Sequence, residues 1–328
     1  MQLIFMRKGS LKQFRDILVY AECDDAECLA QVVSVAAAHG AAVTVCEIVE
    51  PPLRTPDSRG VVEQVSKLRS ARAHQRLRRI CDHFSGHMVI DYAVYVGVPF
   101  LSIVNQVVEQ DFDLVVHISD PVQLEAGSGL NATSMHLMRK CPCTVWALHP
   151  GRPDESGNVV LALDRELAEE VTRAEAFAIT MAETALSLAA ARAGELHVIH
   201  AWQPYGVELL DDPEMVLSES DRKFYQRQQR GSSEVWFKRI YQRIESLAPE
   251  GLSVYPHLVQ GAPVPVVHAA VEENAAGLLV LGTVGTSANP GVLIGPTSES
   301  ILASAGTGVL TLKPPGFVSP LTMGQARA

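Results

Sequence analysis

Three glycines near the C-terminus divide a stretch of sequence that could bind a phosphate. Gly282 ends an apolar run, Gly285 follows three residues later, and Gly295 stands ten residues further on. Glycine lets the backbone adopt a positive φ and approach a ligand closely. Thr297 and Ser298 come next, where a helical pattern begins, and a helix N-terminus offers unpaired N–H groups and the positive end of its dipole. The pattern Gly-x2-Gly-x9-Gly followed by two hydroxyls therefore predicts a phosphate cradle.

A loop that leads into a helix with an ordinary Ser or Thr cap is the alternative interpretation of this stretch. The surrounding sequence favours the ligand site, because the glycines stand between an apolar strand and a helical pattern. Asp164 ends another apolar run, VVLALD, in the same half of the chain. Its carboxylate could cap the next helix or contact a ligand, and the sequence leaves both interpretations open.

The chain repeats one pattern at a fixed distance. The segments YVGVPFLSIVNQVVEQDFDLVV and LVQGAPVPVVHAAVEENAAGLLV both place Gly-x-Pro before a helical stretch and an apolar strand. Gly97 and Gly261 stand 164 residues apart, and the same offset relates Ser134 to Ser298. A register held over about fifty residues indicates a tandem duplication.

The strands expected in the second copy are continuous apolar runs, without the alternation of a half-exposed strand. They lie at 159–163, 195–201, 252–259, 277–282 and 308–313. An Ala-rich stretch at 174–194 has helical periodicity, and a charged stretch at 218–247 indicates a solvated amphipathic helix. Continuous apolar strands indicate a parallel sheet covered by helices on both faces, and right-handed crossovers give it a doubly wound order.

The sequence therefore predicts an α/β protein with two tandem, doubly wound, five-stranded parallel-sheet domains. The expected segments are a first domain at 1–148, a linker at 149–158, a second domain at 159–314 and a tail at 315–328. The linker is rich in Pro, Gly and charge, and the tail is expected to be loose. In doubly wound sheets, ligands bind beyond the carboxyl ends of the strands, where the strand order reverses.

The formal net charge of −10 argues against a broad surface for nucleic acid or anionic membranes. A local anion site stays compatible with that charge, because backbone N–H groups can hold a phosphate. No stretch is predicted to span a membrane or to act as a secretory signal. We therefore expect a cytoplasmic protein that neither inserts into membranes nor binds nucleic acid.

The remaining chemically reactive side chains are expected to be structural. All six cysteines are interpreted as free thiols. The Cys-Pro-Cys motif at Cys141 and Cys143 is interpreted as two small residues that enter a buried strand, because a metal site would need a second group of ligands. His117 lacks a partner at metal or catalytic spacing, whereas His197 and His200 are expected in the core or at its rim. With no P-loop, nucleophile elbow or His-Glu-x-x-His motif, no catalytic residue is predicted.

Together these features resemble the universal stress protein family, and in particular its tandem universal stress protein E group. The residues that carry the resemblance are LVLGTVG at 279–285, GPTSE at 295–299 and ATSMHLMRKCPCTVW at 132–146. The resemblance covers nearly the whole chain. It implies the adenine nucleotide alpha hydrolase-like fold and a regulatory protein of stress tolerance with an ATP site in the second domain.

For family members that bind ATP, the resemblance implies a role for each matching position. Asp164 would contact the nucleoside, and the backbone of Ala201 would face the adenine. The loop after the fourth strand would wrap the ribose and the first phosphates, through Leu281, Gly282, Val284 and Gly285. The other phosphates would lie against Gly295, Thr297 and Ser298. The expected cofactor is ATP, with Mg²⁺ as an optional companion.

Pro296 departs from the family pattern, which usually has Ser or Thr directly after the third glycine. Proline has no N–H and no hydroxyl, so the cradle loses a donor, and the Thr297 hydroxyl could take its place. Losing one or two donors would cost about 1–3 kcal/mol, or about tenfold to a hundredfold in affinity.

The first copy lacks the glycine motif. At the offset of 164 residues the three glycines become Ile118, Pro121 and Asn131, and Glu22 takes the place of Asp164. We expect no phosphate site in the first copy. It would serve as the packing partner of the second copy, in an intramolecular pseudo-dimer that could also form homo-oligomers.

Three functions are compatible with these features. The first is a regulatory protein that binds a nucleotide in its second domain. The second is the same fold binding another small ligand or a protein partner that the sequence does not identify. The third is a slow ATPase, which the absence of an identifiable catalytic base disfavours.

Overall fold

A computed structural model describes the chain except for residues 1–10, 53–58, 122–129, 152–155, 166–170, 211, 213, 284–293 and 322–328. The first half contains five strands and four helices in alternation. They are β1 (Asp16–Ala21), α1 (Ala26–His39), β2 (Ala42–Val49), α2 (Arg59–Phe84), β3 (Ile90–Val96), α3 (Pro99–Gln110), β4 (Leu114–Ile118), α4 (Ala132–Lys140) and β5 (Thr144–Leu148).

The second half repeats this order and adds one short 3₁₀ helix. Its elements are β6 (Val159–Ala162), α5 (Val171–Ala191), β7 (Leu196–Trp202), η3 (Val207–Leu209), α6 (Glu219–Leu247), β8 (Val254–Gln260), α7 (Pro263–Glu273), β9 (Leu278–Gly282), α8 (Pro296–Ala303) and β10 (Gly308–Leu312). The five strands expected from the sequence all form, and their ends differ from the expected ones by no more than two residues.

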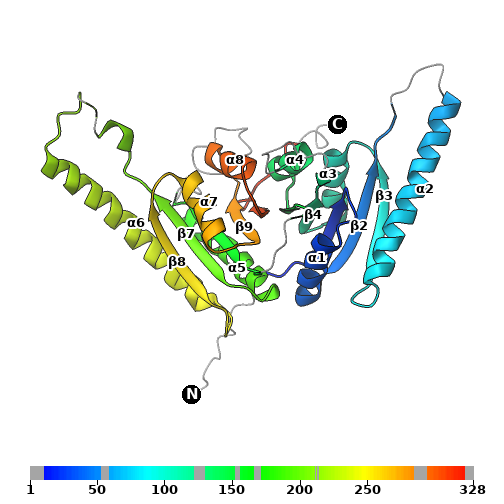
Figure 1. The fold of residues 1–328 in the computed structure, drawn as a ribbon, viewed down its shortest axis with the longest axis horizontal. Coiled ribbons are helices and arrows are strands. Elements are labelled where there is room, and N and C mark those ends of the chain that lie inside the picture. The colour runs from blue at the N-terminus through cyan, green and yellow to red at the C-terminus, as the bar shows by residue number, and fades with distance from the viewer. Residues whose placement is uncertain are drawn as a thin grey trace.

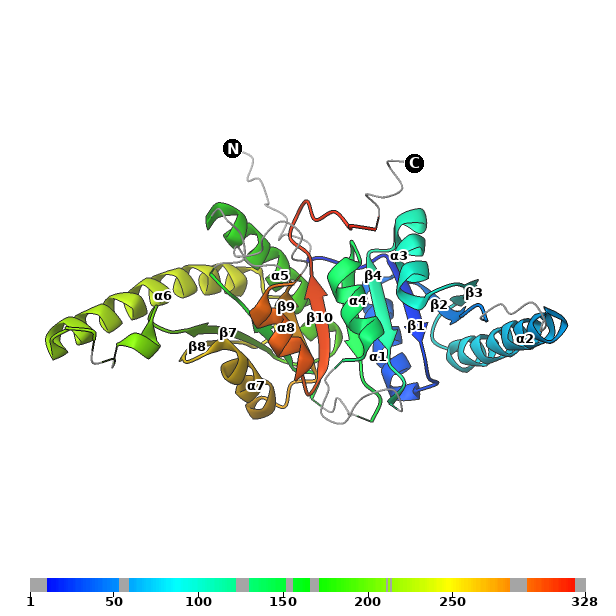
Figure 2. The ribbon, with the colours of Figure 1, turned by 90° about the horizontal axis from the view of Figure 1, so that it is seen from above.

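All ten strands belong to one sheet, in the order β3-β2-β1-β4-β5-β10-β9-β6-β7-β8. Within each half the strands are parallel, which confirms the two predicted doubly wound halves. The halves join through an antiparallel pair, β5 with β10, that the sequence did not predict. The two halves flare apart from this seam, with α2 and α6 along the outer flanks (Figure 1). Figure 2 shows β10 in the middle of the molecule.

The repeated Gly-x-Pro motif has the same conformation in both halves. Gly97 and Gly261 precede α3 and α7 with φ angles of 157° and 155°. A Cβ at Gly97 would approach the Ser102 hydroxyl oxygen to 2.4 Å, so the turn needs glycine. Pro99 and Pro263 are the first residues of the two helices, where proline's missing N–H costs nothing.

Each face of the sheet carries one apolar core that extends across both halves. One core packs α1, α2, α5 and α6 against the sheet, and the other packs α3, α4, α7 and α8. Across the pseudo-twofold axis, α1 contacts α5. Here the Ser187 hydroxyl lies 2.9 Å from Nε2 of His39, and Arg192 donates to Gln31 at 3.2 Å. The halves therefore form the expected pseudo-dimer within one chain.

The long helices of the second half have different environments. α6 is a solvated amphipathic helix as predicted, and it buries Trp236, Phe237, Ile240 and Ile244 against the sheet. Among the described residues, the stretch Thr172–Ala191 of α5 is the one that is long and apolar enough to span a membrane, by composition alone. Because 61% of this stretch is buried inside the fold, its apolar side chains serve the core.

The prediction of a loose tail is wrong for the residues just after β10. Ser319 is only 1% exposed, and Leu321 packs against a core cluster. The Phe317 ring lies 4.8 Å from Nζ of Lys313. Apolar contacts and a cation–π pair hold this segment on the seam. These contacts are made with distant parts of the chain, so the local sequence pattern could not reveal them.

Candidate functional site

The candidate site lies at the carboxyl edge of β6, where the strand order of the second half reverses. Val159 pairs with Leu196 of β7 on one side and with Leu278 of β9 on the other. Continued along the strands, this register sets Asp164 level with Ala201 and with Thr283. α5 and α8 pack on opposite faces of the sheet, and in doubly wound sheets the ligand crevice is expected at such a point, here between β6 and β9.

Asp164 and Ala201 both have the exposure that a ligand contact needs. Asp164 is exposed just beyond β6, and Ala201 is half-buried near the end of β7. The main-chain N–H of Leu163 donates to the Ile199 carbonyl at 2.8 Å, which fixes the two strand ends side by side. The structure therefore brings these two predicted residues to one edge.

Gly282 does not have the positive φ that the glycine pattern led us to expect. It is the last residue of β9, it pairs with Leu312 of β10, and it is not among the glycines with positive φ. Leu281 is 3% exposed and belongs to a core cluster, so only its backbone could contact a ligand. Val284 and Gly285 lie outside the described residues.

Two donors expected at the start of α8 are used within the protein. The Gly295 N–H donates to the Thr283 carbonyl at 2.9 Å. The Ser298 hydroxyl donates to the Gly282 carbonyl at 3.0 Å. These two bonds tie the helix start to the end of β9, so the prediction that Gly295 and Ser298 offer both groups to a phosphate needs correction. Gly295 is the N-cap with φ −68°, and it has no side chain to cap the helix.

The donors that remain at this helix start are the N–H groups of Thr297 and Ser298 and the exposed Thr297 hydroxyl. The first intrahelical bond runs from the Glu299 N–H to the Gly295 carbonyl at 2.9 Å, so both amides precede it. Pro296 occupies the first helical position and contributes no N–H. The Glu299 carboxylate would repel an anion, but it pairs with Arg139 of α4 across the seam.

The corresponding edge of the first half is filled by a buried polar network. His117 is fully buried, and its Nδ1 lies 2.7 Å from the Ser134 hydroxyl. Its Nε2 lies 3.2 Å from a carboxylate oxygen of Glu22. The other Glu22 oxygen accepts from the Asp120 N–H and from the Asn131 side chain, both at 3.0 Å. The prediction that His117 lacks a partner is therefore wrong.

This network occupies the positions that would bind phosphate in the second half. The Asn131 side chain caps α4 by accepting from the Ser134 N–H at 2.9 Å. Burial acts to raise the pKa of the Glu22 carboxyl, but its hydrogen bonds from His117, Asp120 and Asn131 outweigh burial and hold that pKa below its ordinary value. At the tandem offset, His117 in the first half corresponds to the apolar Leu281 in the second half. A comparison of the two copies position by position could therefore have singled out His117, the centre of this network.

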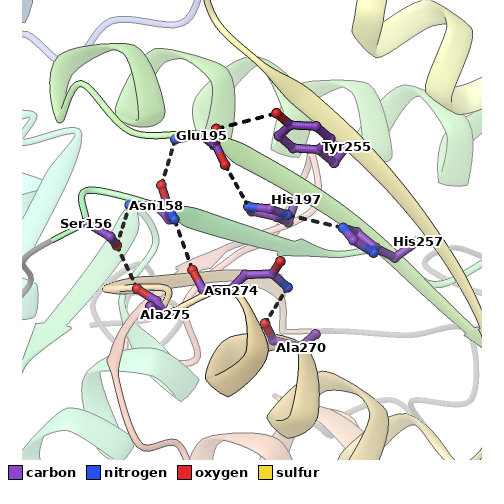
Figure 3. Close-up of polar contacts among 9 residues, drawn as sticks. All are labelled: Ser156, Asn158, Glu195, His197, Tyr255, His257, Ala270, Asn274 and Ala275. Carbon is purple, nitrogen blue, oxygen red and sulfur yellow. Dashed lines mark hydrogen bonds and ion pairs between the residues drawn. The ribbon is translucent and has the colours of Figure 1, made fainter.

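A second polar network lies at the opposite edge of the sheet, before β6 and β7 (Figure 3). Nδ1 of His197 lies 3.1 Å from Nε2 of His257, and Nε2 of His197 lies 3.6 Å from Glu195. The Glu195 N–H donates to the Asn158 side chain at 2.9 Å. His200 bonds to the Leu163 carbonyl at 3.0 Å instead. His200 is thus a satisfied core residue, as predicted, whereas Nε2 of His197 is buried without a hydrogen bond among the described residues and has only the Glu195 carboxylate nearby.

The amino edge of the sheet also has a pocket beside it. The described part of the chain contains no group of three His, Cys, Asp or Glu side chains arranged for a metal ion. A pocket of about 590 Å³ lies beside the amino ends of β9 and β10, with His149, Thr307 and Gly308 in its lining. Ligands of doubly wound sheets bind at the carboxyl ends, so we retain the crevice beside β6 as the candidate site.

Comparison with known proteins supports this choice of half. The model of the universal stress protein family matches residues 159–313. Universal stress protein E of Escherichia coli strain K12 is 24% identical over 277 residues, which cover 84% of this chain and 82% of that protein. A universal stress protein E homolog of Haemophilus influenzae is 25% identical over 214 residues, which cover 64% of this chain and 65% of that protein.

Solved structures share the fold of the whole chain. A protein of unknown function from Pseudomonas aeruginosa PAO1 superposes with a TM-score of 0.64 at 18% identity and covers 96% of this chain and 98% of its own. A universal stress protein from Archaeoglobus fulgidus has a TM-score of 0.60 at 15% identity, with coverage of 92% and 100%. At these identities the likeness shows the two-half architecture and nothing finer.

Proposed function

Because this chain is a tandem member of the universal stress protein family, we propose that it is a regulatory protein whose second domain binds ATP. The site would be the crevice between β6 and β9. The proposal depends on one observation. The strand register places Asp164, Ala201 and Thr283 side by side at the carboxyl ends of three adjacent strands, near the start of α8. We place the protein in the cytoplasm and its role in stress tolerance as part of the same proposal.

Each part of the edge suits one part of a nucleotide. The exposed Asp164 carboxylate can accept hydrogen bonds from ribose hydroxyls. The half-buried Ala201 leaves room for a flat base beside the β7 backbone. The amides of Thr297 and Ser298 and the Thr297 hydroxyl can donate to phosphate oxygens, with the helix dipole behind them. Mg²⁺ would reach the site bound to the phosphates.

The first domain provides an internal control for this proposal. Its helix N-terminus is capped by Asn131, and the carboxylate of Glu22, which stands at the position of Asp164, reaches this cap and brings a negative charge to the helix start. A carboxylate there repels a phosphate and already accepts the nearby N–H groups. Binding should therefore involve one domain per chain.

A thermal shift with ATP in matched variants tests the proposal. ATP should raise the melting temperature of the wild-type chain by mass action. Thr297→Val removes one donor and should reduce this shift, whereas Thr133→Val, at the matching position of the first half, should leave it unchanged. Equal shifts in both variants, or no shift at millimolar ATP, would count against the site.

A non-nucleotide ligand is the second candidate function. Pro296 and the engaged Gly295 amide favour it, because both reduce the number of donors available to a triphosphate. Mass spectrometry of small molecules retained through purification would identify such a ligand directly. The third hypothesis, a slow ATPase, would gain support only from phosphate release that disappears in Asp164→Ala.

A further inference from the structure

Two cysteine thiols and one lysine meet at the seam between the halves. The Sγ atoms of Cys141 and Cys143 lie 3.5 Å apart, and neither thiol is in a disulfide. In the antiparallel pairing of β5 with β10, Thr311 pairs with Val145. Two residues further along this register, Lys313 would lie beside Cys143. The sequence interpretation of the Cys-Pro-Cys motif as two small residues does not account for this lysine.

Lys313 has only neutral acceptors among its hydrogen-bond partners. Its ammonium donates to the Met138 carbonyl and, at 3.1 Å, to the Thr283 hydroxyl. Burial lowers the pKa of Lys313 to about 7, and the two thiols are the groups whose negative charge opposes that effect. The charge of Lys313 would therefore favour a negative charge on the neighbouring thiols.

The two thiols respond differently to this environment. Burial alone would raise the pKa of Cys141, but the hydrogen bond from Cys143 and the charge of Lys313 outweigh burial and lower it. Burial and the neighbouring Cys141 raise the pKa of Cys143. Cys28 and Cys46, elsewhere in the first half, have pKa values raised by burial. The charge of Lys313 and the bond from Cys143 therefore favour ionisation of Cys141, whereas burial and the neighbouring sulfur oppose ionisation of Cys143.

The two cysteines differ in burial as whole residues. Cys143 is half-buried and Cys141 is fully buried, so Cys143 is the cysteine that we assign to the first contact with an oxidant. From this geometry we propose that Cys141 and Cys143 form a reversible redox site, in which hydroperoxides oxidise the pair to a disulfide. The proposal does not depend on nucleotide binding.

The reaction balances with hydrogen peroxide as the oxidant. The Cys143 thiol loses its proton as its sulfur attacks one peroxide oxygen and the O–O bond breaks. The departing hydroxide takes that proton and leaves as water, so that Cys143 carries a sulfenic acid. The Cys141 sulfur then attacks the Cys143 sulfur, the S–S bond forms, the S–O bond breaks, and the departing hydroxide takes the Cys141 proton to leave as a second water. The two sulfurs lose two electrons and the peroxide gains them.

Peptide mapping of the full-length chain after mild peroxide treatment tests the site. Cleavage after Lys140 and Arg165 gives a peptide, 141–165, that contains these two cysteines and no other. We expect this peptide to lose two hydrogens on oxidation and to regain them with a dithiol reductant. A peptide that keeps both free thiols at peroxide levels that oxidise other cysteines of the chain would overturn the proposal.

Single variants separate the two roles. In Cys141→Ser, the Cys143 sulfenic acid has no resolving thiol and should accumulate, where dimedone can trap it. In Cys143→Ser, the buried Cys141 should resist both peroxide and dimedone. The reverse pattern, or equal labelling of the two variants, would contradict the assigned order.

Two substitutions of Lys313 test whether its positive charge activates the cysteine pair. Lys313→Met should slow disulfide formation at neutral pH by about tenfold, because the thiolate loses its cation. Lys313→Arg keeps the charge and should restore the rate. Equal rates in wild type and Lys313→Met would show that Lys313 does not activate the pair.

Discussion

Pro296 and its neighbours determine how many hydrogen-bond donors the start of α8 offers to a ligand. The amide of Gly295 and the hydroxyl of Ser298 are hydrogen-bonded to the end of β9. Few donors therefore remain for a ligand, and each additional donor should have a large effect on the affinity for that ligand. Pro296→Ser adds one amide and one hydroxyl at the first helical position. We expect this change to raise ATP affinity by about tenfold to a hundredfold.

Isothermal titration calorimetry of the full chain measures this gain. The matched control is Ala132→Ser, which introduces the same residue at the corresponding position of α4, adds only a hydroxyl there and should leave ATP binding unchanged. An unchanged affinity in Pro296→Ser would mean that the phosphates do not lie at this helix start.

Glu22 should make the stability of the chain depend on acid pH. Its pKa in the folded chain lies below the ordinary value of 4.5, so its contribution to stability is complete above pH 4.5 and is lost as the pH falls through the folded value. Glu22→Gln should therefore lower the free energy of unfolding by about 1–3 kcal/mol near neutral pH, and the difference should shrink in acid. Urea unfolding across a pH series measures it, and a difference that grows in acid would contradict the network.

The residues of the candidate site were partly predictable from the sequence. Asp164 was found because it ends an apolar run, which marks the edge of a buried strand, and the family resemblance added Ala201. The bonds that engage Gly295 and Ser298 could not be predicted, because they depend on how far α8 approaches β9. Likewise, Glu22, His117 and Ser134 are far apart in sequence, and only the paired strands bring them together.

At the scale of elements, two glycines allow the segment before β6 to pack closely against the turn between α5 and β7. Gly157 stands just before β6, and Gly194 stands between α5 and β7. A Cβ on Gly194 would approach the Gly157 carbonyl oxygen to 2.1 Å, and a Cβ on Gly157 would approach the Arg192 carbonyl oxygen to 2.3 Å. These contacts are with backbone atoms, which cannot rotate away as a side chain can.

Gly194→Ala should therefore destabilise the chain by about 2 kcal/mol or more, through displaced backbone. Gly231, in the middle of α6, has no neighbour within 4 Å of a Cβ, and its φ is not positive. Gly231→Ala should stabilise the chain by about 0.5–1 kcal/mol, because alanine favours the helix. Chemical denaturation of the two variants measures these changes, and effects of the same sign would contradict the packing described for Gly194.

The elements themselves were well predicted, and the reason is physical. Buried parallel strands are continuous apolar runs, and α5 has an Ala-rich helical period, so both leave strong local signals. The antiparallel pairing of β5 with β10 leaves no such signal. Both strands are buried along their whole length, and a fully buried strand has the same composition whichever neighbour it pairs with.

At the scale of the whole molecule, the duplication has produced two halves that share one sheet and two continuous cores. Trp146 of β5 is fully buried at the seam, and α1 packs against α5 across it. The duplication and the loss of the glycine motif in the first half could both be predicted from the fixed offset. The Glu22 network, which fills the edge of the first half with side chains, could not.

Because the cores are continuous, the halves should unfold together. Differential scanning calorimetry of the full chain should show one transition whose calorimetric and van't Hoff enthalpies agree. ATP should move that whole transition upward, since stabilising one half stabilises the shared sheet. Two separate transitions, with ATP moving only one, would mean that the seam contributes little to stability.

The central claim is that one edge of the duplicated fold binds a nucleotide and the other does not. Native mass spectrometry of the full-length chain with ATP counts the bound molecules directly. The account predicts a single ATP per chain at saturation, with reduced occupancy in Thr297→Val and unchanged occupancy in Thr133→Val. A chain that binds no ATP, or that binds two, would contradict it.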